Sequence, residues 1–205
     1  MDKIRDSADI LQPEKEETYQ FIEKLLSSVK ENFSTNRVHL GMDEAVMLGL
    51  GNYLKENGYK KGSLIIREHC NRVVDICRKL ELKPMIWSDM YITANSTGGY
   101  YDLPENTDCS KWEKPKKDLG LVYWDHYHDD TRTYEKMLDI HAQLSDNIIF
   151  AGGSWIWNGI SPNYSKTYAC TKAALSTCKK YSILSHSFKI RIIFIASKCF
   201  LNYLI

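Results

Sequence analysis

Hydrophobic residues recur at helical spacing near the start of the chain and in short runs further along it. The first set predicts a helix over 13–33, because Pro13 suits a first helical turn and the apolar residues that follow share one face. Those residues are Ile22, Leu25, Leu26, Val29 and Phe33. Four short apolar runs predict strands instead. They span 36–40, 84–87, 119–124 and 147–151.

Helical patterns also separate the predicted strands. The stretch 45–57 is expected to be helical up to Gly58, and Ser63 is expected to cap the next helix. A further helix is expected over 166–180. Apolar positions at helical spacing predict the others: Ile66, Val73, Ile76, Cys77 and Leu80, then Tyr134, Met137, Leu138, His141 and Leu144. Short apolar strands that alternate with helices predict an α/β fold with a parallel sheet.

The residues that follow the predicted strands exclude further classes of fold. They are acids and aromatic residues, and no glycine-rich phosphate loop occurs, which excludes the dinucleotide-binding and P-loop classes. Functional groups after successive parallel strands are typical of the (β/α)8 barrel, which needs roughly 250 residues. We therefore expect a partial (β/α)8 TIM barrel that lacks the first strands and an authentic eighth strand. The long loop over 93–117 is expected to be functional or mobile.

Residues 183–205 differ from the rest of the chain. They contain no acid, glycine or proline, and Lys189, Arg191 and Lys198 interrupt them too often for a membrane-spanning helix. We expect residues 1–182 to form the partial barrel and 183–205 to be an anomalous tail, such as a frameshift or a misjoined gene would produce. The alternative is a genuine eighth strand with a closing helix of unusual sequence.

Composition excludes several functional classes. Of the 205 residues, 43% are hydrophobic and 26% are charged, and the net charge is +1, which is ordinary for one soluble domain. This balance predicts no basic stripe for nucleic acid and no patch for an anionic membrane. The five Trp and 13 Tyr residues suit either a site for the apolar faces of sugars or an aromatic core.

Cysteines and histidines give no sign of a metal site. The six cysteines form no Cys-x-x-Cys pair, and no histidine lies near them at zinc spacing. Cys70 and Cys77 share one face of a predicted helix, which favours packing over a disulfide. His126 and His128 are interpreted as part of a polar loop. Residues 1–6 lack the apolar core of a signal peptide, so a cytoplasmic protein with reduced thiols is expected.

Two adjacent carboxylates, Asp43 and Glu44, follow the first predicted strand after Gly41. Adjacent acids at the end of a buried strand repel each other and lose hydration, so a purely structural role is a poor explanation for them. In an extended segment their side chains point to different sides and can reach two parts of one substrate. A neighbouring charge and burial would favour the protonated form of Glu44, as a general acid requires. The alternative is a solvated helix start, where acids are favoured.

The segment 39–44 reads His-Leu-Gly-Met-Asp-Glu and resembles the His-x-Gly-x-Asp-Glu signature of glycoside hydrolase family 20, the β-N-acetylhexosaminidases. Three further segments match this family in order along the chain. They are Trp-Ser-Asp-Met at 87–90, Tyr-Trp-Asp at 123–125 and Trp-Ile-Trp at 155–157. The resemblance extends from about residue 6 to residue 180 and implies a truncated catalytic domain.

This resemblance implies an exo-β-N-acetylhexosaminidase that removes terminal N-acetylglucosamine, with N-acetylgalactosamine as a second candidate sugar. The family uses substrate-assisted retention, in which the 2-acetamido oxygen attacks the anomeric carbon. By the resemblance, Glu44 is the general acid and then the general base, while Asp43 orients the acetamido group and stabilises its developing positive charge. No cofactor or metal is implied. The expected partners are N-acetylhexosamine-terminated glycans, without nucleic acid or membrane.

The resemblance also implies a set of sugar-binding residues. Tyr123 would hydrogen-bond the acetamido carbonyl, and Asp125 would bind a sugar hydroxyl. Trp87 would line the acetamido pocket together with Trp155 or Trp157. The remaining contacts would come from His39 behind the acid pair and from Asp89 and Tyr91 as supporting or hydroxyl-binding residues.

The family pattern is incomplete in this chain. The family places a sugar-binding arginine on its first barrel strand, which is missing here, and a Trp and an acid after its eighth strand. Residues 183–205 contain neither a Trp nor an acid. Each hydrogen bond to a charged group contributes about 1.5–3 kcal/mol, so these losses would weaken transition-state binding by about 10²–10⁴. The alternative function is therefore an inactive truncated remnant that at most binds sugar.

Overall fold

The computed structural model describes residues 2–156, 160–184 and 191–195. The described chain falls into two compact units. The first contains residues 2–97 and 112–119, and the second contains residues 98–111 and 120–195. The long loop predicted over 93–117 is therefore shared between the two units.

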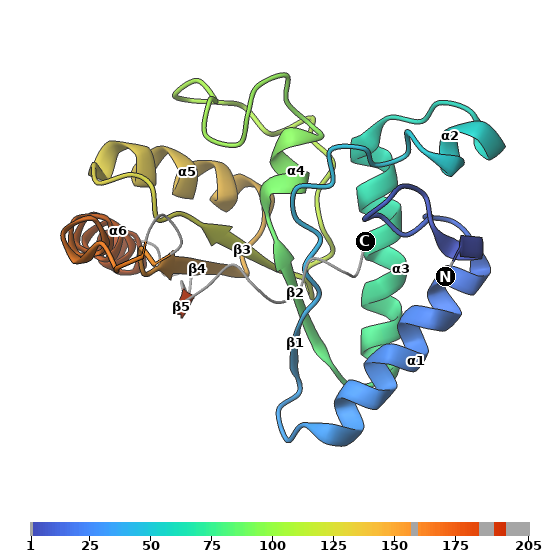
Figure 1. Cartoon of the computed structure of the whole chain (residues 1–205). Helices are drawn as coiled ribbons and strands as arrows, with labels where there is room; N and C mark the ends of the chain where they lie inside the picture. The colour runs from blue at the N-terminus through green and yellow to red at the C-terminus, as the bar shows by residue number, and fades with distance from the viewer. Residues whose placement is uncertain (1, 157–159, 185–190, 196–205) are drawn as a thin grey trace. The chain divides into compact units, whose positions relative to one another are not determined.

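The first unit is built around a pair of parallel strands (Figure 1). Strands β1 (Arg37–His39) and β2 (Lys83–Trp87) pair with Val38 opposite Pro84. A parallel pair needs a crossover connection, and helix α3 (Gly62–Lys79) lies in it. The other elements are η1 (Asp2–Ile4), α1 (Glu16–Asn32), α2 (Asn52–Asn57) and α4 (Asp89–Thr93).

Helices α1 and α3 pack against each other and supply much of the core of the first unit (Figure 1). Each helix buries one apolar stripe, which includes Ile22 and Leu26 on α1 and Ile66 on α3. The hydroxyl of Tyr19 on α1 lies 3.3 Å from Nδ1 of His69 on α3. The parallel pairing of β1 with β2 places the carboxyl ends of the two strands next to each other.

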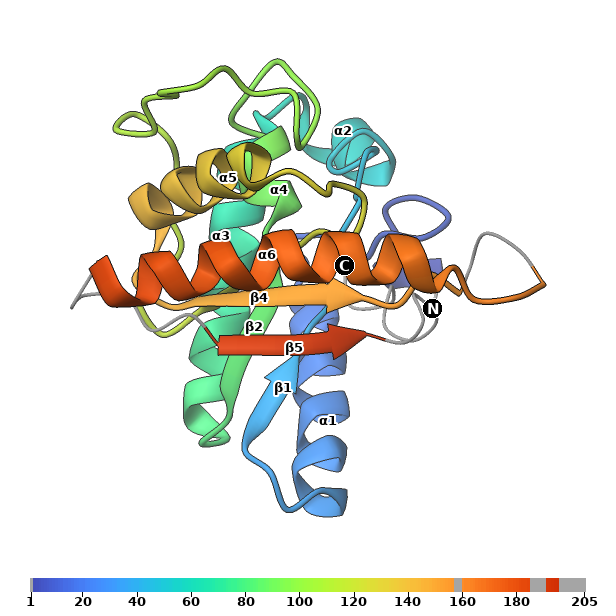
Figure 2. The same cartoon turned by 90° about the vertical axis from the view of Figure 1, so that its left-hand side faces the viewer.

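The described part of the second unit contains three parallel strands and two helices, which Figure 1 labels. Strand β4 (Ile148–Gly153) pairs with β3 (Gly120–Trp124) and with β5 (Arg191–Ile195). Helix α5 (Thr131–Leu144) connects β3 to β4, and α6 (Tyr164–Leu184) lies along β4 in Figure 2. Strand β4 is buried along its whole length, as expected of a strand that is covered on both faces.

The α/β fold class predicted from the sequence is confirmed, and the four predicted strands appear as β1 to β4. Two local predictions are wrong. Residues 46–51 form turns and bends instead of helix, because Gly49 adopts a left-handed backbone with φ +72°. Ser63 does not cap α3, which begins at Gly62, and its side chain is buried within the first turn.

The expected tail over 183–205 is described only in part. Residues 183–184 continue α6, and residues 191–195 form β5, which pairs with β4. The sequence-based prediction of four strands therefore missed β5, because no alternation or turn signal marks it. Residues 185–190 and 196–205, including the region of the alternative closing helix, lie outside the described residues.

The buried carboxylate of Asp6 fastens the N-terminal loop to the segment that follows the acid pair. It accepts the N–H groups of Gly49 at 3.1 Å and of Tyr53 at 2.6 Å. The Asp6 carbonyl oxygen lies so close to Gly51 that a Cβ there would clash with it. Only a residue without a side chain fits at this approach.

We expect Gly51→Ala to lower the free energy of unfolding by about 2 kcal/mol or more, because the backbone at Asp6 must move. Gly62→Ala is the matched control. Its Cβ would meet only ordinary contact, 3.8 Å from Ala94, so it should leave stability unchanged or raise it slightly. Urea denaturation measures both variants, and equal stabilities would contradict the close approach at Gly51.

Candidate active site

A left-handed turn carries the acid pair beyond the end of β1. Gly41, Met42 and Glu44 have φ values of +73°, +69° and +51°, a region that glycine adopts without cost and other residues adopt with strain. The Met42 side chain is 1% exposed, and its Sδ lies 3.6 Å from Sγ of Cys70 on α3. Packing of Met42 therefore holds a strained turn next to two carboxylates, as is common at functional sites.

Asp89 fixes this turn from the neighbouring strand end. Its side chain is 3% exposed, and its Oδ2 accepts the backbone N–H of Glu44 at 2.8 Å. Asp89 begins α4, two residues after the end of β2, so the ends of the paired strands are tied together here. Hydrogen bonds to a carboxylate are stronger than neutral ones. Asp89 thus positions Glu44 through its main chain, a role that the sequence indicated only as a supporting or hydroxyl contact.

The two carboxylates differ in their exposure to solvent. Asp43 is half-buried, whereas Glu44 is exposed. The predicted burial of Glu44 is therefore wrong. The predicted extended segment is also wrong, because left-handed residues on both sides of Asp43 create a turn. The turn places one shielded and one exposed acid side by side in the chain, and different environments give neighbouring acids different roles.

His39 and Trp87 end the paired strands of the first unit and lie against each other. Their ring centroids are 4.3 Å apart and the planes make an angle of 51°. Nδ1 of His39 accepts the Gly41 N–H at 3.0 Å, so the ring proton is on Nε2. Burial lowers the pKa of His39 to about 4, and within the described chain its Nε2 has no hydrogen-bond partner. His39 therefore supports the acid pair through the backbone of the turn.

In the second unit, Tyr123 and Asp125 at the end of β3 contact each other. The Tyr123 hydroxyl donates to Asp125 Oδ2 at 3.0 Å, as the i, i+2 spacing at an extended chain end allows. Both are buried, with exposures of 0% and 1%. Asp125 Oδ1 accepts the N–H groups of Tyr127 and His128 at 2.9 and 3.3 Å, and Oδ2 lies 2.8 Å from Nδ1 of His128. Three of the four donors to this carboxylate therefore come from the loop after β3, and the fourth is Tyr123 on the strand itself.

Aromatic rings surround the loop after β3. Trp155 donates its indole N–H to the His126 carbonyl, and its ring centroid lies 5.6 Å from that of Tyr127. Trp124 stacks on Tyr100, with ring centroids 5.3 Å apart, and so packs against the long loop. Trp157 lies outside the described residues. The aromatic bias of the composition is therefore partly explained by packing around this strand end.

The long loop contributes a residue that sequence reasoning did not single out. The Tyr101 hydroxyl donates to the Trp124 carbonyl at 2.7 Å, and its ring centroid lies 4.8 Å from that of His128. Lys136 on α5 donates to the Tyr101 carbonyl at 2.8 Å. The Gly-Gly-Tyr-Tyr-Asp segment at 98–102 marked this loop in the sequence, but nothing indicated its partners. These contacts fix the loop beside the end of β3.

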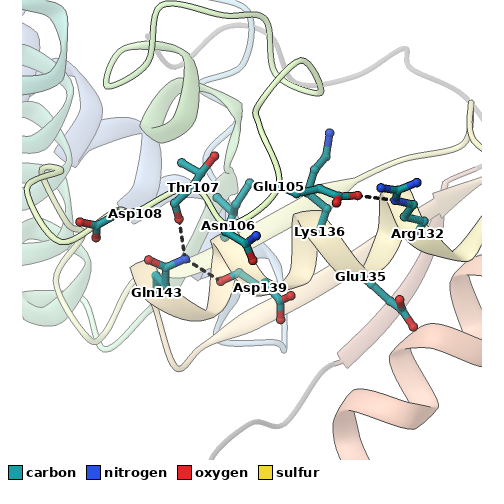
Figure 3. A pocket seen from close by; sticks show the side chains of 10 residues that line it. Glu105, Asn106, Thr107, Asp108, Arg132, Glu135, Lys136, Asp139 and Gln143 are labelled. Atoms are coloured by element: carbon teal, nitrogen blue, oxygen red, sulfur yellow. Dashed lines mark hydrogen bonds and ion pairs between the residues drawn. The ribbon is translucent and has the colours of Figure 1, made fainter.

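A polar cavity of about 610 Å³ lies between α5 and residues 105–108 of the second unit (Figure 3). Gln143 joins its two walls, because its Nε2 donates to the Thr107 carbonyl and its Oε1 accepts the Cys109 N–H, both at 3.0 Å. None of the predicted site residues lines this cavity. The strand ends, and not this cavity, are therefore the candidate active site.

Within the described part of the chain, no group of three or more histidine, cysteine or acidic side chains could bind a metal ion. The cysteines with a described position are buried and are not part of a disulfide; they are Cys70, Cys77, Cys109, Cys170 and Cys178. Nor does any described helix combine the length and apolarity needed to cross a bilayer.

His141 on α5 is a buried base behind the strand-end site. Its ring centroid lies 4.8 Å from that of Tyr123, and its Nδ1–H donates to the Met137 carbonyl at 2.6 Å. Burial lowers the pKa of His141 from 6.5 to about 4. The unfolded chain therefore takes up a proton at a pH where the folded chain keeps the ring neutral. The contribution of His141 to the free energy of unfolding is fully present above pH 6.5 and decreases as the pH falls towards 4.

We expect acidification to destabilise the fold through His141. Between about pH 6.5 and 4.5 its protonation in the unfolded chain should lower the free energy of unfolding by ~2–3 kcal/mol. Urea denaturation at several pH values in this range measures the slope. His141→Gln should show a shallower slope than the wild type, whatever its absolute stability. Parallel slopes would contradict the assignment of a buried neutral histidine.

Functional side chains at the carboxyl ends of successive parallel strands are typical of α/β enzymes. The family model for the glycosyl hydrolase family 20 catalytic domain matches residues 2–147. The match covers well over half of the chain and includes every predicted site residue except Trp155 and Trp157. The chain therefore belongs to glycosyl hydrolase family 20, a family of glycoside hydrolases, which confirms the resemblance seen in the sequence. A search of curated proteins found no match.

Proposed function

We propose that this chain is an exo-β-N-acetylhexosaminidase that uses substrate-assisted, retaining catalysis. The observation that carries the proposal is the Asp43–Glu44 pair, which lies in a strained turn fixed by Asp89 within the region that matches the family. The family resemblance also implies a (β/α)8 barrel, with which the alternation of strands and helices agrees. The proposed substrates are glycans that end in N-acetylglucosamine, with N-acetylgalactosamine as a second candidate sugar.

Glu44 is proposed to move the proton in both steps. In the first step its carboxyl group donates a proton to the glycosidic oxygen, while the acetamido oxygen of the substrate forms a bond to the anomeric carbon and the leaving group departs. In the second step the Glu44 carboxylate takes a proton from water, which attacks the same carbon and opens the oxazolinium ring. Two displacements at one carbon retain its configuration. The exposed position of Glu44 gives it access to a leaving group and to water.

Asp43 is proposed to hold the acetamido group during ring closure. The amide nitrogen becomes positively charged as its oxygen attacks, so a carboxylate beside it stabilises the transition state more than the ground state. Asp43 is half-buried, and partial exclusion of water strengthens this interaction. A neutral side chain of the same shape would retain a hydrogen bond but lose the charge.

The remaining sugar contacts are proposed from the family resemblance, residue by residue. Trp87 and either Trp155 or Trp157 would contact the acetamido group and the sugar ring, and Tyr123 would donate to the acetamido carbonyl. Asp125 would bind a hydroxyl or act through Tyr123, whose hydroxyl it holds at 3.0 Å. His39 is assigned a supporting role, because its Nδ1 is engaged by the Gly41 N–H.

A second candidate function is sugar binding without turnover. The exposure of Glu44 favours it, because enzymes commonly bury the general acid to keep it protonated. On this alternative, the aromatic residues and Asp43 would still bind an N-acetylhexosamine. The two functions differ in one observable, which is release of the aglycone.

A series of aryl N-acyl-β-glucosaminides tests the proposal. Replacing the acetyl hydrogens by one, two and three fluorines withdraws electrons from the acyl oxygen and weakens it as a nucleophile. We expect kcat/KM to fall steeply along the series, and the aryl β-glucoside without an amide to be inert. Equal rates along the series would indicate an enzymic nucleophile and contradict the proposal. Sugar binding without aglycone release would favour the second candidate.

A further inference from the structure

We propose that His128 is a positioning residue that controls the Tyr123 hydroxyl through the carboxylate of Asp125. The inference rests on the proposed function, in which Tyr123 donates to the acetamido carbonyl of the substrate. Its basis is that the side chains of Tyr123 and His128 contact the same atom. The Tyr123 hydroxyl lies 3.0 Å and the His128 Nδ1 lies 2.8 Å from the same oxygen, Oδ2 of Asp125.

The hydrogen bonds around Asp125 determine where the protons lie on Asp125 and His128. Oδ1 accepts two backbone N–H groups, so the carboxylate acts as an acceptor on both oxygens. Nδ1 of His128 therefore carries a proton in either charge state, and Nε2 is the nitrogen that gains or loses one. The His128 side chain is 30% exposed while that of Asp125 is 0% exposed. The histidine is thus the member of the pair in contact with solvent.

The charge of His128 alters how strongly Asp125 holds Tyr123. When His128 is protonated, it compensates the buried negative charge, and the Tyr123 hydroxyl becomes easier to turn towards a substrate carbonyl. When His128 is neutral, the charge of Asp125 acts on Tyr123 alone. Burial first, and then the charge of Asp125, raises the pKa of Tyr123 well above its usual value, which means that the uncompensated carboxylate makes this hydroxyl a poorer donor.

Several charged and titratable groups surround His128, and their balance favours its protonated form. The hydrogen bond to Asp125 is the main reason that the pKa of His128 lies above 6.5. The charge of Asp130 acts in the same direction, while partial burial and the charge of Lys136 on α5 oppose it. Two tyrosines also pack here: the ring of Tyr101 lies 4.8 Å away, and the hydroxyl of Tyr134 on α5 donates to the His128 carbonyl at 2.8 Å.

The binding test uses the methyl thioglycoside of N-acetylglucosamine, which keeps the acetamido group, resists hydrolysis and carries no titrating group. Calorimetry of the full chain between about pH 5 and 9 should show affinity falling by about 3- to 10-fold as His128 loses its proton. His128→Asn is the matched variant, because its amide nitrogen occupies the place of Nδ1 but does not titrate. This step should disappear in His128→Asn and in Tyr123→Phe. The same step in His128→Asn would overturn the proposal.

Titration of the His128 ring by nuclear magnetic resonance tests the coupling without any ligand. Tyr123→Phe removes the competing donor from Oδ2 and should raise the pKa of His128, whereas Asp125→Asn should lower it. Tyr123→Phe alone decides the test where Asp125→Asn does not fold. An unchanged His128 pKa in Tyr123→Phe would overturn the coupling. A folded wild type that binds no thioglycoside at any pH would contradict the proposed function instead, and the ring titration would then decide the coupling by itself.

Discussion

Replacing Glu44 with glutamine is expected to lower kcat/KM for aryl N-acetyl-β-glucosaminides by about 10²–10⁴, the usual contribution of general acid–base catalysis. The amide has nearly the shape of the carboxyl group but cannot deliver the proton. The backbone N–H of residue 44 would still donate to Asp89, at 2.8 Å in the present structure, so the turn should persist. The loss should be largest for phenyl and much smaller for dinitrophenyl glycosides, because a good leaving group departs without protonation.

Glu17→Gln provides the matched control for this substitution. Glu17 is exposed on α1, in the same unit as Glu44, and its replacement should leave kcat/KM unchanged. Steady-state kinetics with the two leaving groups give the required comparison. Full activity of Glu44→Gln on the phenyl glycoside would remove Glu44 from the catalytic role, and an equal loss with both leaving groups would argue against its role as an acid.

Replacing Asp43 with asparagine is expected to lower kcat by about 10²–10³, with a smaller change in KM. Removal of one preorganised electrostatic contact costs about this much when charge develops in the transition state. The asparagine side chain can still hydrogen-bond the substrate amide, so ground-state binding should be less affected. Steady-state kinetics on the N-acetyl substrate measures the change in kcat and the change in KM separately.

The control for this second substitution is Asp146→Asn. Asp146 is exposed and precedes β4, so its replacement should change neither constant. Circular dichroism and urea denaturation of Asp43→Asn establish that the variant is folded. Wild-type kcat in a folded Asp43→Asn would rule out the role assigned to Asp43.

The sequence predicted the elements of the fold because their signals are local. Helix α1 follows from apolar residues at helical spacing, and β2 to β4 follow from short apolar runs. The prediction failed over 46–51, where two glycines interrupt a helical pattern, and at β5, whose segment has no alternation. The existence of β5 depends on pairing with β4, and pairing between distant segments leaves no mark on a single stretch of sequence.

The site could be predicted in its residue types but not in its contacts. Adjacent acids after a short strand indicated Asp43 and Glu44, yet the left-handed turn that exposes Glu44 depends on Asp89 and on the packing of Met42. These partners lie far from the acid pair in the sequence or inside the core. The spacing of Asp125 and His128 is a local signal, because aspartate often accepts N–H groups two and three residues later. That signal was visible in the sequence, but His128 was interpreted only as part of a polar loop.

Calorimetric binding of N-acetylglucosamine-thiazoline tests the central claim most directly. This compound mimics the cyclised intermediate, so its affinity reports the acetamido site without requiring turnover, and transition-state mimics bind much more tightly than substrates. We predict binding at least about 10²-fold tighter than that of N-acetylglucosamine, with the advantage lost in Asp43→Ala. A folded wild-type chain that binds the thiazoline no better than the simple sugar would contradict substrate-assisted catalysis by this protein.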